Sequence, residues 1–253
     1  MTYIYAVANQ KGGVGKTTSC VCLSAALAEH GKRVLLVDLD PQGGLTTALG
    51  FNPDSFDTTI YTVLIDDEVS LDKAITNSKT DKVDFVPANL DLAGAEGELL
   101  GEIGWDRTLK VALEPVQESY DYIFLDCPPS LGVLTTNALI AAQRVLIPVQ
   151  TEYLAMRGLK QLTQVLTKVR RKGNPNLKSK VLRTLHQART IHASEASDEL
   201  EKVLGDQIYK TIIHRTIKFA EASVAGEPLL SYLPESKGAT AYRELAKEVL
   251  EDE

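Results

Sequence analysis

Cysteine and long apolar runs are scarce in this 253-residue chain, and each shortage excludes a class of protein. The three cysteines are odd in number, and the spacing of Cys20 and Cys22 suits neither a disulfide framework nor a zinc site. A reducing cytoplasm is therefore the expected compartment. No apolar stretch reaches the roughly 18 residues that a membrane span needs. The opening residues, MTYIYAVANQ, have no basic segment and no cleavage site typical of secretion signals.

Acidic residues are missing from one long segment, although the whole chain carries a net charge of −7. The overall acidity argues against nucleic-acid binding, whereas this segment, the basic stretch of residues 157–189, argues for it. The alternative is a solvated helix end, where cations favour the helix dipole. Between Glu152 and Glu195 the ten charged residues are all basic: Arg157, Lys160, Lys168, Arg170, Arg171, Lys172, Lys178, Lys180, Arg183 and Arg189.

The rest of the sequence alternates strand and helix patterns. Continuous apolar runs are typical of strands covered on both faces, as in parallel sheets. They occupy residues 3–9, 33–40, 82–88, 121–129 and 144–150, and later strands are expected at 180–185 and 207–213. Helical patterns occupy residues 17–31, 107–119, 133–143, 159–171 and 240–253. The order predicts one doubly wound α/β domain over residues 1–253, with a mostly parallel sheet and helices on both faces.

A glycine-rich loop, NQKGGVGKTTS, joins the first strand to the first helix. Such a loop can turn its backbone N–H groups toward a polyphosphate, and the helix N-terminus adds a favourable potential. Lys16 is expected to reach the β- and γ-phosphates, and the Thr17 hydroxyl is expected to bind Mg²⁺. The spacing departs from the common phosphate loop, because Gln10 stands where the first glycine would fall and Lys11 adds a second lysine.

Several blocks in one order resemble the ParA/MinD superfamily of deviant Walker-A ATPases, most closely the Soj/ParA-type partition ATPases. They are ANQKGGVGKTT, GKRVLLVDLDPQG, VPANLDLAGAE, YDYIFLDCPPSLG, NAL, PVQTEY, KTII and GATAYRELAKEV, and they cover the chain nearly end to end. The resemblance implies a P-loop NTPase fold, ATP and Mg²⁺ as cofactors, ATP hydrolysis, and a homodimer that forms when ATP is bound.

The resemblance also assigns roles to individual residues. Lys11 would reach the phosphates of the other subunit; the alternative is a solvated loop charge. Asp38 would help to hold the water shell of Mg²⁺, Asp40 would orient the attacking water, and Asp126 would support Mg²⁺ through water. Prolines follow Asp40 and Asp126, so a turn or cap role remains the alternative for these two. ATP contacts are expected from Lys11, Gly12, Gly13, Val14, Gly15, Lys16, Thr17 and Thr18.

Two blocks depart from the family pattern, and both lie near the adenine in relatives. Gln187, in TLHQART, stands where the family has an acidic residue, and His214, in IIHRT, stands in place of a proline. Because glutamine offers both a donor and an acceptor and histidine can stack, Gln187 and His214 are expected to contact the base. A metal site at His186 and His192 is not expected, because two ligands are too few; a solvated surface is the favoured interpretation. Cys20 and Cys22 are expected in the core.

The favoured function is an ATP-switched partition ATPase, cytoplasmic and nucleoid-associated, whose dimer binds duplex DNA non-specifically until a ParB-like, cargo-bound partner triggers hydrolysis. The resemblance gives Arg189, Arg215 and Lys218 as DNA contacts, and the basic stretch adds Arg170, Arg171, Lys172, Lys178 and Lys180. A MinD-like membrane-cycling ATPase is the main alternative, but it would favour a basic C-terminal helix, and KEVLEDE is acidic. A metal-cluster carrier and a nucleotide-dependent biosynthetic enzyme are the others.

Overall fold

The computed structural model describes residues 2–151, 155–187, 200–202 and 204–252. Its strands form an eight-stranded sheet in the order β3-β4-β2-β5-β1-β6-β7-β8. All neighbouring strands are parallel except β3, which runs antiparallel to β4. The strands are β1 (Tyr3–Val7), β2 (Val34–Asp38), β3 (Thr76–Asn77), β4 (Val83–Val86), β5 (Tyr122–Asp126), β6 (Arg144–Gln150), β7 (Lys178–His186) and β8 (Ile208–His214).

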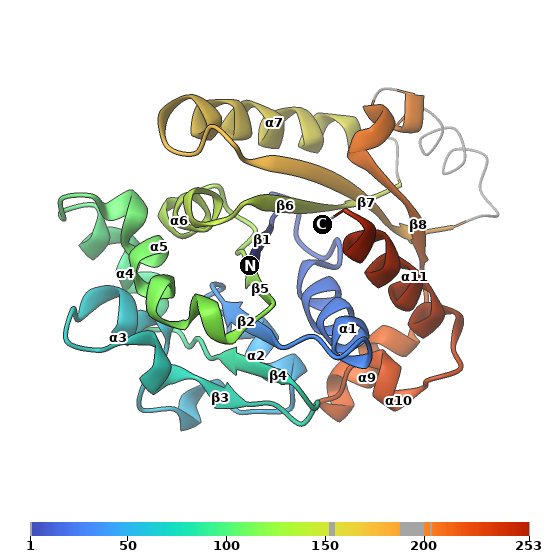
Figure 1. The fold of residues 1–253 in the computed structure, drawn as a ribbon, viewed down its shortest axis with the longest axis horizontal. Coiled ribbons are helices and arrows are strands. Elements are labelled where there is room, and N and C mark those ends of the chain that lie inside the picture. The colour runs from blue at the N-terminus through green and yellow to red at the C-terminus, as the bar shows by residue number, and fades with distance from the viewer. Residues whose placement is uncertain (1, 152–154, 188–199, 203, 253) are drawn as a thin grey trace.

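Helices cover both faces of the sheet, as the sequence predicts (Figure 1). One face carries α1 (Lys16–Glu29), α2 (Gly44–Ala48), α9 (Lys218–Ala225), α10 (Leu229–Tyr232) and α11 (Lys237–Glu251). The other carries α3 (Ile60–Ile65), α4 (Leu92–Leu99), α5 (Thr108–Leu113), α6 (Val133–Ala141) and α7 (Ala155–Lys172). Short 3₁₀ turns are η1 (Pro53–Ser55), η2 (Leu71–Ala74), η3 (Trp105–Arg107), η4 (Glu114–Ser119) and η5 (Gly205–Gln207).

Two hydrophobic cores lie on the two faces because strand side chains alternate. On β1, Ile4 and Ala6 join the core under α3–α7, whereas Tyr5 and Val7 join the core under α1 and α11. The cysteine prediction is confirmed, since Cys20 and Cys22 are buried in α1. The continuous apolar runs are thus explained by burial on both sides.

The sequence patterns located the central strands and missed several peripheral elements. The two-residue β3, the glycine-containing α4 and the short α9 and α10 carry too little periodicity to be predicted. The single helix expected over residues 107–119 is wrong: α5 ends at Leu113 and Pro115 lies in the 3₁₀ turn η4. Proline lacks the N–H that a continuing α-helix needs and its ring crowds the preceding turn.

Three strands end side by side at one edge of the sheet, which we call the carboxyl edge. Asp126 of β5 pairs in register with Val7 of β1 on one side and with Asp38 of β2 on the other. Ligands of doubly wound sheets bind at this edge. Among the described residues, no helix is long and apolar enough to span a membrane.

Candidate functional site

The glycine-rich loop adopts a conformation that its glycines make possible. Gly13 and Gly15 have φ angles of 70° and 89°, in the left-handed region that side-chain-bearing residues avoid. Gly15 is also the N-cap of α1, so the first free N–H groups of that helix adjoin the loop. Lys16 follows at the first helical position with a residue exposure of 8%. The loop therefore brings backbone donors, a helix N-terminus and one buried cation together.

Two carboxylates lie buried at the carboxyl edge beside the loop. Asp38 accepts hydrogen bonds from the Thr46 N–H and hydroxyl, both at 2.9 Å, and from the Asp40 N–H at 3.1 Å. Asp126 accepts the Thr17 hydroxyl at 2.6 Å, so the helix that follows the loop is joined to the end of β5. Burial, then the neighbouring charge of Asp126, raises the pKa of Asp38. Burial is also the main cause of the raised pKa of Asp126, and Lys16 opposes it.

One oxygen of Asp126 fits a role toward a hydrated cation. Its Oδ1 is buried and has no hydrogen-bond partner within the described residues, while Oδ2 is held by Thr17. Two adjacent buried carboxylates are costly unless a positive charge compensates them. The described residues contain no cluster of three or more metal-ligating His, Cys, Asp or Glu side chains. Mg²⁺ suits this arrangement, because it keeps several waters and takes few protein ligands beside substrate phosphates.

Asp40 differs from the two buried carboxylates. It is half-exposed, its Oδ1 accepts the Gln42 N–H at 3.0 Å, and it lines the pocket beside the loop. This contact is the turn role that the proline after Asp40 suggests. It uses one carboxylate oxygen, so the other oxygen is left for a contact in the pocket. The geometry therefore accommodates both the turn role and the water-orienting role expected for Asp40.

The pocket beside the loop has a volume of about 440 Å³ and extends from the phosphate loop to a second, largely apolar end. That end is formed by β7, β8 and α9, and the sequence reasoning did not find it. Its lining residues are Thr184, Leu185, Ile213, Thr216, Phe219, Ala220 and Ser223, while Pro129 and Tyr242 complete the wall. The loop end is lined by Gly12, Gly13, Gly15, Lys16, Thr17 and Thr18 together with Asp40.

Gln187 and His214, the residues expected to contact the base, lie outside this lining and are exposed. The reason at β8 is strand alternation: Ile213 faces the pocket, so its neighbour His214 points to the other face. On β7, a register irregularity lies between Arg183 and His186, and Leu185 within it has a φ of 50°. No sequence pattern marks that bulge, which is why Leu185 was missed. A base contact by Gln187 or His214 stays a prediction.

His186 is not the solvated residue that its sequence position suggested. Its Nδ1 is 3.0 Å from the Thr151 hydroxyl, and its ring packs edge-on against His214 with the ring centroids 5.3 Å apart. Burial, the nearby His214 and Arg183 lower the pKa of His186. His192, the other member of the pair, lies outside the described residues. His186 and His214 therefore pack against each other between β7 and β8.

The second lysine of the loop lies apart from the pocket lining. The Lys11 Nζ donates a hydrogen bond of 2.9 Å to Oε1 of Gln150, at the end of β6, and both side chains are exposed. The Lys11 N–H is held by the Asn9 side chain at 3.0 Å, and Asn9 in turn donates to the Pro148 carbonyl. The loop backbone is thus fixed, while the Lys11 ammonium is placed at the surface of this edge rather than over its own phosphate site.

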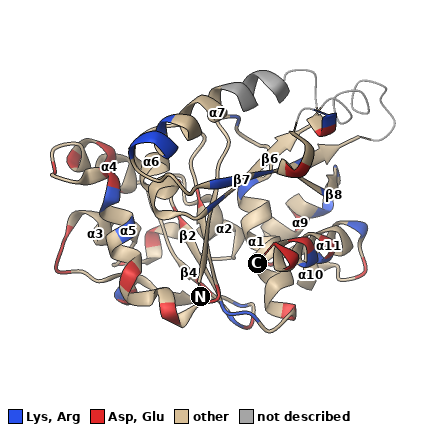
Figure 2. Ribbon diagram, turned by 45° about the horizontal axis from the view of Figure 1, so that its top comes forward, with Lys and Arg blue, Asp and Glu red and all other residues tan. Residues whose placement is uncertain are grey.

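The predicted DNA contacts fall at opposite edges of the sheet (Figure 2). Arg215 and Lys218 follow β8 at the carboxyl edge, where Lys218 forms an ion pair with Glu221 at 2.7 Å. Lys178 begins β7 at the opposite, amino edge, and Arg171 and Lys172 end α7 near it. Along the nine residues of β7, the two edges are about 26 Å apart. Arg189 lies outside the described residues.

At least three members of the basic stretch have structural partners. Arg183 is buried and forms an ion pair with Glu201 at 3.2 Å. Arg170 donates to the Leu177 carbonyl at 2.8 Å and to the Ser179 hydroxyl at 3.0 Å, which fastens α7 to β7. Lys180 forms an ion pair with Asp252 and lies 4.7 Å from the ring centroid of Tyr209. Arg171, Lys172 and Lys178 are exposed. The basic stretch therefore divides into cations that hold the fold and cations available at the surface.

The chain is similar to known proteins over nearly its whole length. Residues 2–179 match the AAA domain family. The chain is 47% identical to the sporulation initiation inhibitor protein Soj of Bacillus subtilis, over 98% of each chain, and 40% identical to the chromosome partitioning protein ParA of Myxococcus xanthus, over 98% of this chain and 87% of that protein.

A solved structure is also similar over nearly the whole fold. It is named as a cobyrinic acid a,c-diamide synthase from Mycobacterium smegmatis with bound ADP and magnesium, and it aligns with a TM-score of 0.85 and 41% identity. The alignment covers 99% of this chain and 94% of that one. Through its phosphate loop, sheet and extended similarity, the chain belongs to the AAA domain family, in its ParA/MinD type.

Proposed function

We propose that this protein is an ATP-switched positioning ATPase: Mg²⁺–ATP closes a homodimer, the dimer binds duplex DNA without sequence preference, and hydrolysis releases it. The observation that carries the proposal is the Thr17–Asp126 hydrogen bond of 2.6 Å beside the buried Asp38, at the mouth of a glycine-rich loop. In this arrangement the loop can bind a phosphate chain, and the adjacent Thr17 and carboxylates can hold a hydrated divalent cation.

Each residue of the site has a definable part in hydrolysis. The loop N–H groups and Lys16 would bind the phosphate oxygens, and Thr17, Asp38 and Asp126 would hold Mg²⁺, the last two through water. When bound, Mg²⁺ neutralises charge on the β- and γ-phosphates. Asp40 would orient the attacking water, since it is the half-exposed carboxylate in the pocket. Hydrolysis of this type needs little beyond positioning and charge compensation.

Lys11 suits a contact across a dimer. Its ammonium is exposed at the carboxyl edge and bonded to Gln150 rather than directed into its own pocket. Two anionic nucleotides that face one another need bridging cations. In the proposal, Lys11 exchanges Gln150 for a phosphate of the second subunit, which makes dimerisation depend on ATP.

DNA binding would follow from dimerisation. Non-specific affinity grows with the number of phosphates that cations neutralise, so the exposed cations of one subunit should bind weakly and those of two linked subunits much more strongly. Two relatives of this chain are named as a chromosome partitioning protein and as Soj, which favours a ParB-like, cargo-bound activator and a place on the nucleoid.

The test is a binding assay with several unrelated DNA duplexes and with anionic liposomes, each in the presence of Mg²⁺–ATP, a slowly hydrolysed analogue, or ADP. Binding to every duplex with the ATP forms alone supports the proposal, and steep weakening with added salt is expected. Liposome binding without DNA binding would favour a MinD-like membrane cycle. Equal DNA binding with ADP would exclude the nucleotide switch.

A second candidate is an ATP-dependent amide synthetase, because the similar solved structure bears the name of a cobyrinic acid diamide synthase. The same phosphate site could activate a carboxylate. Incubation with ATP, glutamine and cobyrinic acid, followed by mass spectrometry, distinguishes the two: amidated product would support the synthetase, whereas ATP turnover that responds to DNA and yields no product would support the positioning ATPase.

A further inference from the structure

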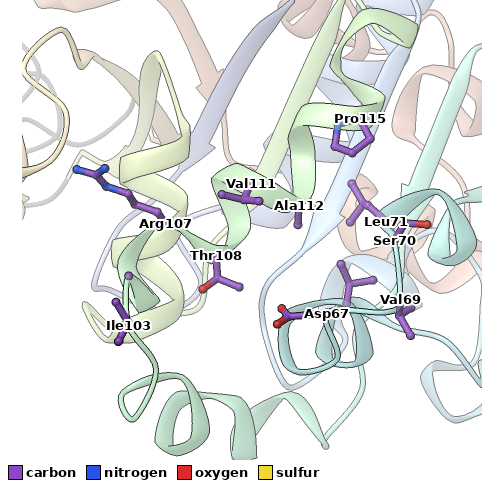
Figure 3. Close-up of a pocket in the computed structure, with 12 residues that line it drawn as sticks. Asp67, Val69, Ser70, Leu71, Ile103, Arg107, Thr108, Val111, Ala112 and Pro115 are labelled. Carbon is purple, nitrogen blue, oxygen red and sulfur yellow. The ribbon is translucent and has the colours of Figure 1, made fainter.

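A second cavity lies away from the nucleotide pocket, on the face of the sheet covered by α3–α7. It has a volume of about 510 Å³ and is open between α3–η2 and η3–α5; we call it the α3–α5 groove. Figure 3 shows Thr108, Val111 and Ala112 facing Asp67 and Val69 across it. Its apolar lining consists of Val63, Val69, Leu71, Ile103, Val111, Ala112 and Pro115.

Apolar side chains are unusually exposed around this groove. Ile103 is fully exposed, Val111 is 61% exposed, and Leu100 in the preceding turn is 57% exposed. Single exposed apolar residues are ordinary, but several that adjoin one concave surface mark an interaction site. Within the described residues, Leu90, Leu100, Ile103 and Val111 are half of the exposed large hydrophobic side chains, and three of them line or adjoin the groove.

The rim of the groove is strongly acidic. The lining residues and their immediate sequence neighbours include two cations, Arg107 and Lys110, and seven carboxylates. None of the carboxylates forms an ion pair with another described residue. The Asp67 carboxylate points into the gap, whereas Arg107 extends away from it (Figure 3). The carboxylates are Asp66, Asp67, Glu68, Asp72, Glu102, Asp106 and Glu114.

From this combination we propose that the α3–α5 groove is the docking site for a cationic amphipathic helix of a partner protein. Apolar side chains of the helix, spaced three and four residues apart, would lie on Val111, Ile103 and Val69, and lysines or arginines beside them would meet the carboxylate rim. The same rim repels nucleic acids and anionic membranes, so the DNA surface of the proposed function lies elsewhere.

The wall of the groove is fastened to a helix that leads to the nucleotide site. Asn137 of α6 accepts the Leu109 N–H at 3.1 Å and donates to the Trp105 carbonyl at 2.8 Å. Asn137 is buried, and α6 begins shortly after Asp126. A helix bound in the groove therefore contacts the wall that Asn137 holds, and Asn137 lies in the same helix, α6, that begins seven positions after the end of β5 at Asp126.

The experiment measures binding of a fluorescein-labelled helical peptide of about 15 residues, built from leucine and lysine in an amphipathic pattern. A peptide of the same pattern with glutamate in place of lysine is the charge control. One double variant, Ile103→Ser with Val111→Ser, removes apolar contact, and another, Asp66→Lys with Asp67→Lys, reverses the rim. Val224→Ser and Glu235→Lys are matched controls, because both residues are exposed at other sites.

Saturable binding of the lysine peptide is expected, weakened about tenfold or more by each double variant and unchanged by each control. Lys16→Ala should retain peptide binding, because Lys16 lies in the nucleotide pocket and not in the groove. The docking site can therefore be supported even if the proposed ATPase function is wrong. Equal binding of the glutamate peptide, or full affinity in both double variants, would overturn the docking site. Dissociation of a nucleotide-free dimer by the Ile103→Ser and Val111→Ser pair would instead assign the groove to a second copy of this chain.

Discussion

The carboxyl edge of the parallel sheet holds buried charged side chains, whereas the basic stretch presents exposed cations at the amino edge. At the carboxyl edge, Lys16, Asp38 and Asp126 are buried and held by a glycine-rich loop, Thr46 and Thr17. At the amino edge, Arg171 and Lys172 are exposed at the end of α7. Fixed, dehydrated charge suits phosphate chemistry, whereas exposed charge suits non-specific contact with a polyanion.

The lysine at the helix N-terminus gives the largest expected effect. Lys16→Ala should lower ATP affinity by roughly 100-fold or more, because a buried cation is lost from the phosphate site. Calorimetric titration with ATP and Mg²⁺ measures it, with Lys237→Ala, at an exposed position of α11, as the matched control. ATP affinity close to that of the parent protein would refute the phosphate-loop assignment.

Asp40 tests whether the half-exposed carboxylate differs in role from the buried ones. Asp40→Ala should bind ATP and dimerise, yet hydrolyse ATP about 100-fold more slowly, because only the orientation of water is lost. Phosphate release and sedimentation, measured on the same sample, separate the two properties. Turnover near the parental rate would remove Asp40 from the mechanism and leave it the turn role seen in its bond to Gln42.

Lys11 tests the exposed charge at the carboxyl edge. Lys11→Ala should leave ATP affinity within about threefold of the parent and weaken ATP-dependent dimerisation about tenfold, because its phosphate contact lies across the dimer. Sedimentation with a non-hydrolysable ATP analogue measures this. Gln150→Ala is a useful companion, since it removes the hydrogen bond that Lys11 donates within its own subunit. Parental dimerisation of Lys11→Ala would show that the cross-subunit role is wrong.

The salt dependence of DNA affinity tests whether the exposed cations at the amino edge contact DNA. Arg171→Ala with Lys172→Ala should reduce the slope of log affinity against log salt by about one per lost phosphate contact, with ATP-dependent dimerisation preserved. Arg215→Ala probes the carboxyl edge in the same way, and Arg189→Ala is expected to act likewise. Arg170→Ala with Arg171→Ala should also lower the slope, but it removes the bonds that fasten α7 to β7.

A slope unchanged by Arg171→Ala with Lys172→Ala, but reduced by Arg215→Ala, would confine DNA to the carboxyl edge. The basic stretch would then be a solvated helix end.

The smallest expected effect concerns the protons of the buried carboxylates in nucleotide-free protein. Burial raises the pKa of Asp126 to about 7, whereas an unfolded aspartate has a pKa of about 3.9. The folded state therefore binds the proton more tightly, and this stabilisation is full below about pH 4 and is lost as the pH rises through 7. The melting temperature of the parent should fall across that range.

Asp126→Asn removes this titrating group, so its melting temperature should change less between pH 5 and pH 8 than that of the parent, by roughly 5 °C or more. Scanning calorimetry in the presence of a chelator measures the difference, with Asp206→Asn, at an exposed position, as the control. The variant should also lose the extra stability that Mg²⁺–ADP confers on the parent. Identical pH profiles for parent and variant would contradict the assigned burial effect.

The sequence by itself determined the central strands and the glycine-rich loop, because these depend on local information. A strand buried on both faces is an unbroken apolar run, and a glycine loop before a helix needs only adjacent residues. The roles of Asp38 and Asp126 came from the resemblance to the family, and the register of β2 and β5 places the two residues side by side.

Only the tertiary structure decided the apolar end of the nucleotide pocket and the α3–α5 groove. It also decided which cations of the basic stretch hold the fold and which are exposed. Leu185 enters the pocket through a bulge in β7, and Ile213 rather than His214 faces it because of strand alternation. Lys180 is held by Asp252, which is 72 residues away in the chain. Such outcomes depend on which distant segments meet, and no periodicity or short motif in one segment encodes its partner.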